Sequence, residues 1–130
     1  MPRFSILLVD DEKEVHKLLR EFLEVVFGER FVVHSAYNGA EALEKFEQLV
    51  GMGQEPDLVL MDLRMPVMDG IEATRRIKEK HPGKEVVVLT AYSKEAELVR
   101  RAIEAGAKKI ISKSIGYRKV VEEIGEILKI

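Results

Sequence analysis

Acidic residues follow directly on two apolar runs, and at these positions the sequence indicates chemistry. The run at residues 6–9 ends at Asp10 and Asp11, and the run at residues 58–61 ends at Asp62. If both runs are parallel strands of one sheet, their carboxyl ends meet at the edge where open α/β sheets bind ligands. The carboxylates stay close there only if a pKa rises or a divalent cation lies among them. Oxygen ligands without a neighbouring His or Cys favour Mg²⁺.

Two further apolar runs end in residues that can bind an anion. Residues 86–89 precede the hydroxyl of Thr90, and residues 110–112 precede the ammonium of Lys113. A metal, a hydroxyl donor and a fixed cation around one carboxylate can position a phosphoryl group and neutralise its charge during in-line transfer. Asp62 is the predicted acceptor, because it ends a buried run where an unpartnered charge is costly. Acids after a strand can alternatively serve as helix N-caps, a role open to Asp11.

The elements that must position these residues recur about every 25 residues along the chain. Strands are predicted to begin near residues 5, 31, 57, 85 and 108. Apolar spacing and capping residues predict a helix after each strand. The predicted helices run from Asp11 to Gly28, from Asn38 to about Val50, from Gly70 to His81, over 93–106 and from about Tyr117. This pattern predicts one doubly wound α/β domain, (βα)5, with a five-stranded parallel sheet.

Composition limits the classes of protein to consider. The 130 residues suit one domain with a single core. There is no cysteine, which excludes disulfides, thiol catalysis and cysteine metal sites. The first apolar run is too short for a signal sequence, and no stretch approaches membrane-spanning length. We therefore expect a soluble cytoplasmic protein with no membrane association.

The net charge of −2 conceals an asymmetry between the two halves of the chain. Residues 1–62 carry 6 basic and 13 acidic side chains, net −7, whereas residues 63–130 carry 15 and 10, net +5. One interpretation is a dipolar domain with a basic side. The alternative is a surface of locally paired charges, such as Glu97 with Arg101.

These residues carry a resemblance to a known family. The motifs are Leu8-Val9-Asp10-Asp11-Glu12, Met61-Asp62-Leu63-Arg64-Met65-Pro66 with Asp69-Gly70, Leu89-Thr90-Ala91, and Gly106-Ala107 before Lys113. In this order and spacing the chain resembles a response regulator receiver domain, and the resemblance covers nearly all of residues 1–130. It implies one receiver domain with a flavodoxin-like fold and the strand order 2-1-3-4-5.

The resemblance also implies a reaction and a set of roles. Asp62 would take a phosphoryl group from a phosphohistidine of a sensor histidine kinase or phosphotransfer protein, with Mg²⁺ required. Such a domain catalyses its own phosphorylation and dephosphorylation, and it signals rather than acting as an enzyme on a separate substrate. The implied metal site comprises Asp10 (through metal-bound water), Asp11, Asp62 and the backbone carbonyl of Arg64. Thr90 and Lys113 would bind the phosphoryl oxygens.

Two positions depart from the family pattern and concern the output. The family usually has an aromatic residue three positions before the lysine, where this chain has Ile110, so the switch formed by Thr90 and Ile110 lacks a ring. Ser114 replaces the usual Pro after Lys113. A non-Pro cis bond costs about 3–4 kcal/mol, so we expect a trans bond there.

The output surface implied by the resemblance is formed by the fourth helix, fifth strand and fifth helix. Its basic side chains would favour an acidic protein partner over nucleic acid, because no recognition motif accompanies the charges. They are Arg100, Arg101, Lys108, Lys109, Arg118 and Lys119.

Rival functions come from other classes. A haloacid dehalogenase-type phosphatase has a second Asp two residues after the acceptor, where this chain has Arg64. A flavodoxin-like FMN carrier needs a phosphate-binding loop after the first strand, but the acids at 10–12 would repel a phosphate. A degenerate receiver that only binds partners would not be modified by acetyl phosphate. Histidine chemistry is not expected; His16 is predicted on the polar side of the first helix.

Overall fold

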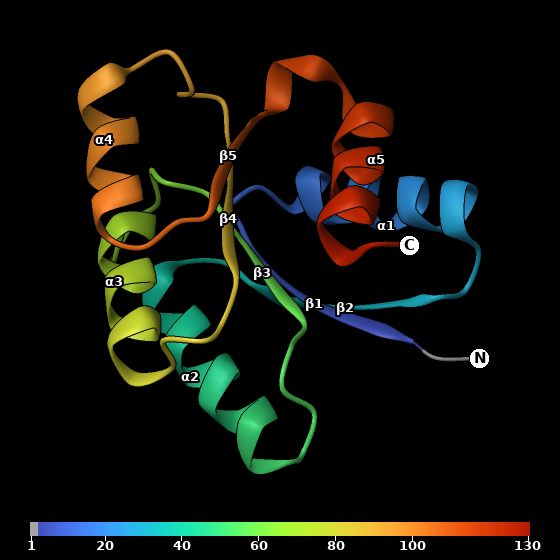
Figure 1. The fold of residues 1–130 in the computed structure, drawn as a ribbon, viewed down its shortest axis with the longest axis horizontal. Coiled ribbons are helices and arrows are strands. Elements are labelled where there is room, and N and C mark those ends of the chain that lie inside the picture. Colours follow the sequence, from blue (N-terminus) through green and yellow to red (C-terminus); the bar gives the residue numbers. More distant parts are fainter. Residues whose placement is uncertain (1–2) are drawn as a thin grey trace.

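The computed structural model describes residues 3–130 and contains one parallel sheet with the strand order β2-β1-β3-β4-β5 (Figure 1). This confirms the predicted doubly wound, flavodoxin-like α/β fold. The elements in chain order are β1 (Phe4–Val9), α1 (Lys13–Phe27), β2 (Phe31–Ala36), α2 (Gly39–Gly51), β3 (Leu58–Met61), α3 (Gly70–Lys80), β4 (Val86–Thr90), α4 (Ala96–Glu104), β5 (Lys109–Ser112), the 3-10 turn η1 (Lys113–Ile115) and α5 (Tyr117–Leu128).

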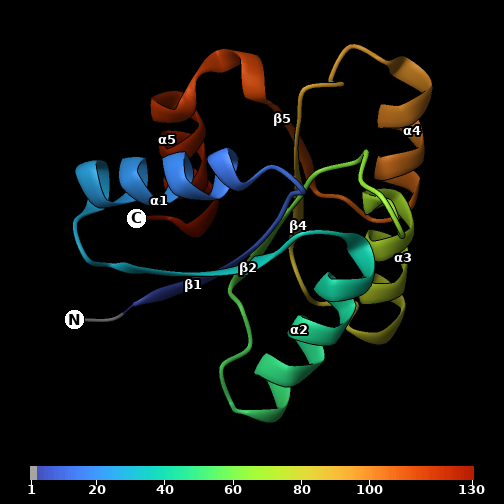
Figure 2. The ribbon, with the colours of Figure 1, turned by 180° about the vertical axis from the view of Figure 1, so that it is seen from behind.

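Helices cover both faces of the sheet. α1 and α5 lie on one face and α2, α3 and α4 on the other, as two opposite views show (Figures 1 and 2). Along β1, Leu8 packs in the cluster under α1 and α5, and Leu7 packs in the cluster under α2 and α3. A strand buried on both faces must be apolar throughout, which explains the continuous runs in the sequence.

Two helix starts differ from the prediction. α1 begins at Lys13 with Glu12 at the N-cap position and no side-chain cap, so Asp11 does not cap this helix. α4 begins at Ala96 rather than near residue 93, because the preceding residues form a turn closed by the Glu95 N–H to the Tyr92 carbonyl at 3.1 Å.

Gly70 brings α3 directly against the end of β3. A Cβ at this position would lie 1.8 Å from the backbone oxygen of Asp62, far inside van der Waals contact. The Gly70 N–H also donates to the Leu63 carbonyl at 2.9 Å. Only glycine therefore allows the helix to support the strand end that carries Asp62. No helix among residues 3–130 has the length and apolar character needed to cross a membrane.

Candidate functional site

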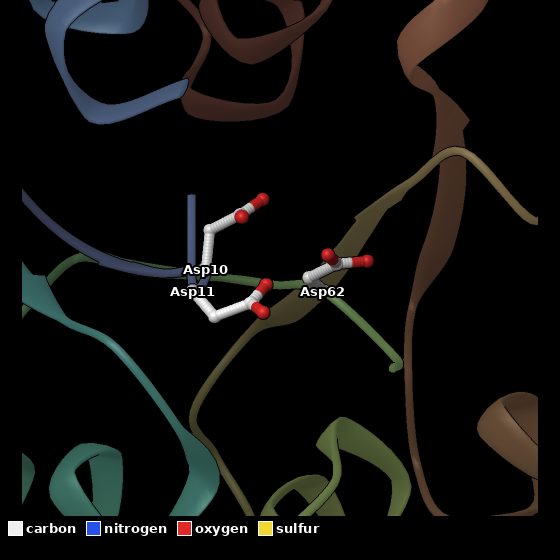
Figure 3. A group of neighbouring side chains, drawn as sticks. All are labelled: Asp10, Asp11 and Asp62. Carbon is white, nitrogen blue, oxygen red and sulfur yellow. The ribbon is translucent and has the colours of Figure 1, made fainter. Parts of the chain in front are cut away.

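Three carboxylates converge at the carboxyl edge of the sheet. Asp10 and Asp11 follow β1, Asp62 follows β3, and these neighbouring strands are paired in register up to Val9 and Met61. One carboxylate oxygen of each acid lies within 4.8 Å of the others (Figure 3). Asp10 and Asp62 are 1% and 5% exposed, whereas Asp11 is exposed. The structure thus brings together the acids that the sequence singled out.

Asp62 has an environment that disfavours its charge. Burial raises the pKa of its carboxyl above the ordinary value; Lys113 opposes this rise and the negative charge of Asp10 adds to it. The Leu63 N–H donates to Asp62 Oδ1 at 2.8 Å, and the Thr90 hydroxyl also favours the charged form. Protonation of the Asp62 carboxyl, or an additional cation beside it, would remove the electrostatic cost of its buried charge.

Lys113 supplies the fixed cation at the site. Its Nζ lies 2.7 Å from Asp10 Oδ2, 3.3 Å from Asp62 Oδ2 and 3.7 Å from Glu12 Oε1. Burial opposes the charge of Lys113, but contact with Asp10 and attraction to both buried acids outweigh burial and raise the pKa of the ammonium. Lys113 therefore stays charged and offsets only part of the acidic cluster.

The donor set fits a hard divalent cation. Three carboxylates and one ammonium leave the cluster with two negative charges in excess when all are ionised. Asp10 Oδ2 is buried and forms an ion pair with the Lys113 ammonium at 2.7 Å. The excess negative charge and the oxygen-only donor set suit Mg²⁺.

Thr90 lies at the same edge, at the end of β4. Its side chain is fully buried, and its Oγ1 accepts a hydrogen bond from the Tyr92 N–H at 3.1 Å. The register of β4 with β5 pairs Thr90 with Ser112, so Lys113 follows directly on the neighbouring strand. Ile110 is half-buried on β5 and packs against the buried cluster that includes Val88 of β4 and Ala102 of α4.

The loops around the site have two notable features. The peptide bond between Lys113 and Ser114 is trans, as predicted for a position without proline. In the loop after β3, the Arg64 side chain extends to the loop after β4, where it pairs with Glu95 at 2.6 Å and lies over the Tyr92 ring at 4.8 Å. The assignment of the Arg64 carbonyl to the metal site stays a prediction.

His16 lies at the site, although it was predicted on the polar side of the first helix. It is 2% exposed, its Nε2 is 2.8 Å from the Asp10 carbonyl, and its Nδ1 is 2.7 Å from Ser35 Oγ. Burial lowers the pKa of His16, against the effects of Asp10. Helical spacing could have predicted the burial of His16, because it stands three and seven residues before the buried Leu19 and Leu23.

Comparisons with known proteins agree with this geometry. The family model for the response regulator receiver domain matches residues 6–125. The chain is 39% identical to the chemotaxis protein CheY of Halobacterium salinarum, and the match covers 95% of this chain and 96% of that protein. It is 40% identical to the transcriptional regulatory protein ResD of Bacillus subtilis, covering 96% of this chain but 48% of ResD.

A solved structure extends the agreement to three dimensions. The chain is similar to one in the CheX-CheY-BeF3-Mg complex from Borrelia burgdorferi, with a TM-score of 0.83 and 30% identity, covering 98% of this chain and 90% of that one. The sheet order, the acidic cluster and a family match over most of the chain lead to one conclusion: the protein belongs to the response regulator receiver domain family of two-component signalling systems.

Proposed function

We propose that Asp62 accepts a phosphoryl group from a phosphohistidine of a sensor histidine kinase or phosphotransfer protein, with Mg²⁺ as cofactor. The observation that carries this proposal is the position of Asp62, a buried carboxyl with a raised pKa between Lys113 and two further acids. Family membership supports it, as does the Borrelia complex, whose name includes BeF3 and Mg.

Mg²⁺ would be held by Asp11 and Asp62, by Asp10 through water, and by the carbonyl of Arg64. When bound, the cation supplies positive charge that offsets the phosphoryl oxygens. Asp62, whose ionised form is disfavoured by burial and by the charge of Asp10, would then be available as the carboxylate nucleophile.

The side chains around Asp62 have separate tasks in the transfer. An Asp62 carboxylate oxygen forms a bond to phosphorus as the phosphorus–nitrogen bond of the donor breaks, and the electron pair remains on the imidazole nitrogen. The Lys113 ammonium and the Thr90 hydroxyl bind phosphoryl oxygens. The same groups serve hydrolysis, in which water attacks phosphorus and Asp62 leaves, so the domain catalyses both its phosphorylation and its dephosphorylation. We also propose that this chemistry takes place in the cytoplasm.

The proposal includes an output surface formed by α4, β5 and α5, which would bind a downstream protein partner without direct nucleic-acid contact. Several of its basic side chains are already paired: Arg100 with Glu97 and Glu104, Lys108 with Glu85, Lys109 with Glu123, and Arg118 with Glu122. Within residues 3–130, Arg101 of α4 and Lys119 of α5 form no ion pair, and Ile103 of α4 is 54% exposed. A partner with acidic and apolar groups matches this surface.

Phosphorylation with a small donor tests the assignment. With acetyl phosphate and Mg²⁺, intact mass should increase by one phosphoryl group, and Asp62→Asn should abolish the increase. Asp57→Asn is the matched control, because Asp57 lies at the opposite end of β3 and its Oδ2 accepts from the Ser5 N–H at 2.7 Å. Equal labelling of the Asp62 variant would refute the acceptor assignment, and an unmodified wild type would favour a receiver that only binds partners.

A further inference from the structure

The peptide that joins Asp10 to Asp11 is held by a side chain from α1. His16 Nε2 lies 2.8 Å from the Asp10 carbonyl oxygen. A carbonyl oxygen can only accept, so Nε2 carries the proton and donates. The two acids on either side of this peptide provide two of the three converging carboxylates.

No backbone group takes the place of this donor. The Asp10 N–H donates to the Ala36 carbonyl at 3.1 Å, and Asp10 Oδ1 accepts from the Glu12 N–H at 2.9 Å. Among residues 3–130, His16 is the one donor to the Asp10 carbonyl. Asp10 is 1% exposed, so its carbonyl would lose its hydrogen bond and gain little from water without His16.

The far side of the ring fixes its orientation and its tautomer. Arg20 Nη2 donates to Ser35 Oγ at 2.7 Å and to the Val33 carbonyl at 3.0 Å. Because Arg only donates, Ser35 accepts from Arg20 and gives its own proton to His16 Nδ1, 2.7 Å away. The Tyr37 ring, with its centroid 4.5 Å from that of His16, covers one face of the imidazole.

Asp11 depends on this support more than Asp10 does. Lys113 contacts Asp10 directly, whereas among residues 3–130 no hydrogen bond or ion pair holds the exposed Asp11 carboxylate. Asp11 also lies between β1 and α1, outside the regular hydrogen bonding of either element. The direction of its Cα–Cβ bond, from which the carboxylate extends, therefore depends on the peptide plane that precedes it.

We propose that His16 is a positioning residue for the Mg²⁺ site, acting through the peptide between Asp10 and Asp11 and held in turn by Ser35 and Arg20. This inference rests on the proposed function, because it assigns His16 to the same metal site. Outer groups that orient metal ligands typically change metal affinity by about 10–100-fold when removed. His16 acts through a backbone carbonyl, so we expect about tenfold, at the lower end.

The test compares His16→Leu with His16→Gln, since Gln can place an amide N–H near the position of Nε2. Mg²⁺ affinity is measured from amide chemical shifts of residues 10–12 and 62–64, which report on folded protein. His16→Leu should weaken Mg²⁺ binding about tenfold, and His16→Gln should restore most of it. The rate of acetyl phosphate labelling should fall in His16→Leu at low Mg²⁺ and recover at saturating Mg²⁺.

Two further variants separate positioning from folding. His34→Leu is the matched control, because His34 is half-buried on β2 next to Ser35, where successive side chains point to opposite faces, and it should leave Mg²⁺ affinity unchanged. Ser35→Ala keeps the imidazole but removes the hydroxyl that fixes its tautomer, so it should weaken Mg²⁺ binding. This variant tests the inference even if His16→Leu fails to fold. The inference would be overturned by unchanged Mg²⁺ affinity in folded His16→Leu or in Ser35→Ala. It would also be overturned if the Leu and Gln variants of His16 lost Mg²⁺ affinity equally. In each of these cases the wild type would still be labelled by acetyl phosphate, so the proposed function would remain. A wild type that neither binds Mg²⁺ nor is labelled would instead overturn the proposed function with it.

Discussion

Replacing Asp11 with Asn tests whether repulsion among the three acids destabilises the metal-free protein. Two unit charges 4.8 Å apart, the limit of the spacing among the three acids, repel by about 0.9 kcal/mol at the dielectric of water and about 3.5 kcal/mol at an effective dielectric of about 20. Asp11 is exposed and the Lys113 ammonium lies in the same cluster, so the lower value applies. Asp11→Asn should stabilise the metal-free protein by about 1 kcal/mol, or about 4 °C in Tm for a domain of this size.

The same substitution should remove most of the response to Mg²⁺. At a Mg²⁺ concentration one hundred times the Kd, a site present only in the folded state stabilises the wild type by about 2.7 kcal/mol. Thermal unfolding of both proteins, in chelator and with Mg²⁺, measures the two effects. The variant should melt higher than the wild type in chelator and gain much less from Mg²⁺.

Asp57→Asn provides the control for total charge, since it removes one negative charge at the far end of the sheet. It should leave the Mg²⁺ response intact. The reasoning fails if Asp11→Asn destabilises the metal-free protein by 1 kcal/mol or more, or if Mg²⁺ stabilises it as much as the wild type. Added salt should reduce the gain in chelator, because the repulsion is screened.

Three further substitutions test other parts of the site. The pKa of Asp62 in the folded protein is raised above its ordinary 3.8, so ionisation of Asp62 costs stability as pH rises through the folded pKa. Asp62→Asn should therefore raise the urea midpoint at pH 7 in chelator. This gain should shrink as pH falls towards 4, where Asp62 becomes protonated. Val67 has a φ of 68° and is 84% exposed, so Val67→Asn should stabilise by about 1 kcal/mol in urea unfolding, whereas Val25→Asn, in α1, should not. Gly70→Ala should cost about 3 kcal/mol and slow labelling of Asp62, while Gly51→Ala, with open space around it, should be nearly neutral; similar midpoints for the two glycine variants would contradict the close contact.

The sequence was sufficient for the sheet and for the acidic cluster because both depend on simple rules. Apolar runs mark buried parallel strands, and parallel strands bring their carboxyl ends together. This is how Lys113, far from Asp10 along the chain, is predicted beside it and lies 2.7 Å away in the structure. The start of α4 was missed because the turn from Tyr92 to Glu95 carries no periodic signal.

Contacts between side chains were harder to predict. His16 was assigned from its polar type to the wrong side of α1, although its spacing matches the buried stripe. On α4, Glu97 was expected to pair with Arg101, but it pairs with Arg100, which also reaches Glu104. Such choices depend on rotamers and on neighbouring elements, and helical spacing alone offers both partners at similar cost.

The contacts of α4 bear on how the proposed phosphorylation of Asp62 would reach the proposed output surface without an aromatic residue at position 110. Of the nine residues of α4, Ala102 is the fully buried one, so this helix is held less firmly than its neighbours, which bury four or five. Ile110 packs against the cluster that contains Ala102 of α4, and its side chain is shorter than the aromatic ring usual at this position. Arg64 provides a second connection, because it joins the loop after Asp62 to Glu95 at the start of α4. We therefore propose that a shift in the loop after β3 reaches α4 mainly through Arg64, Tyr92 and Glu95.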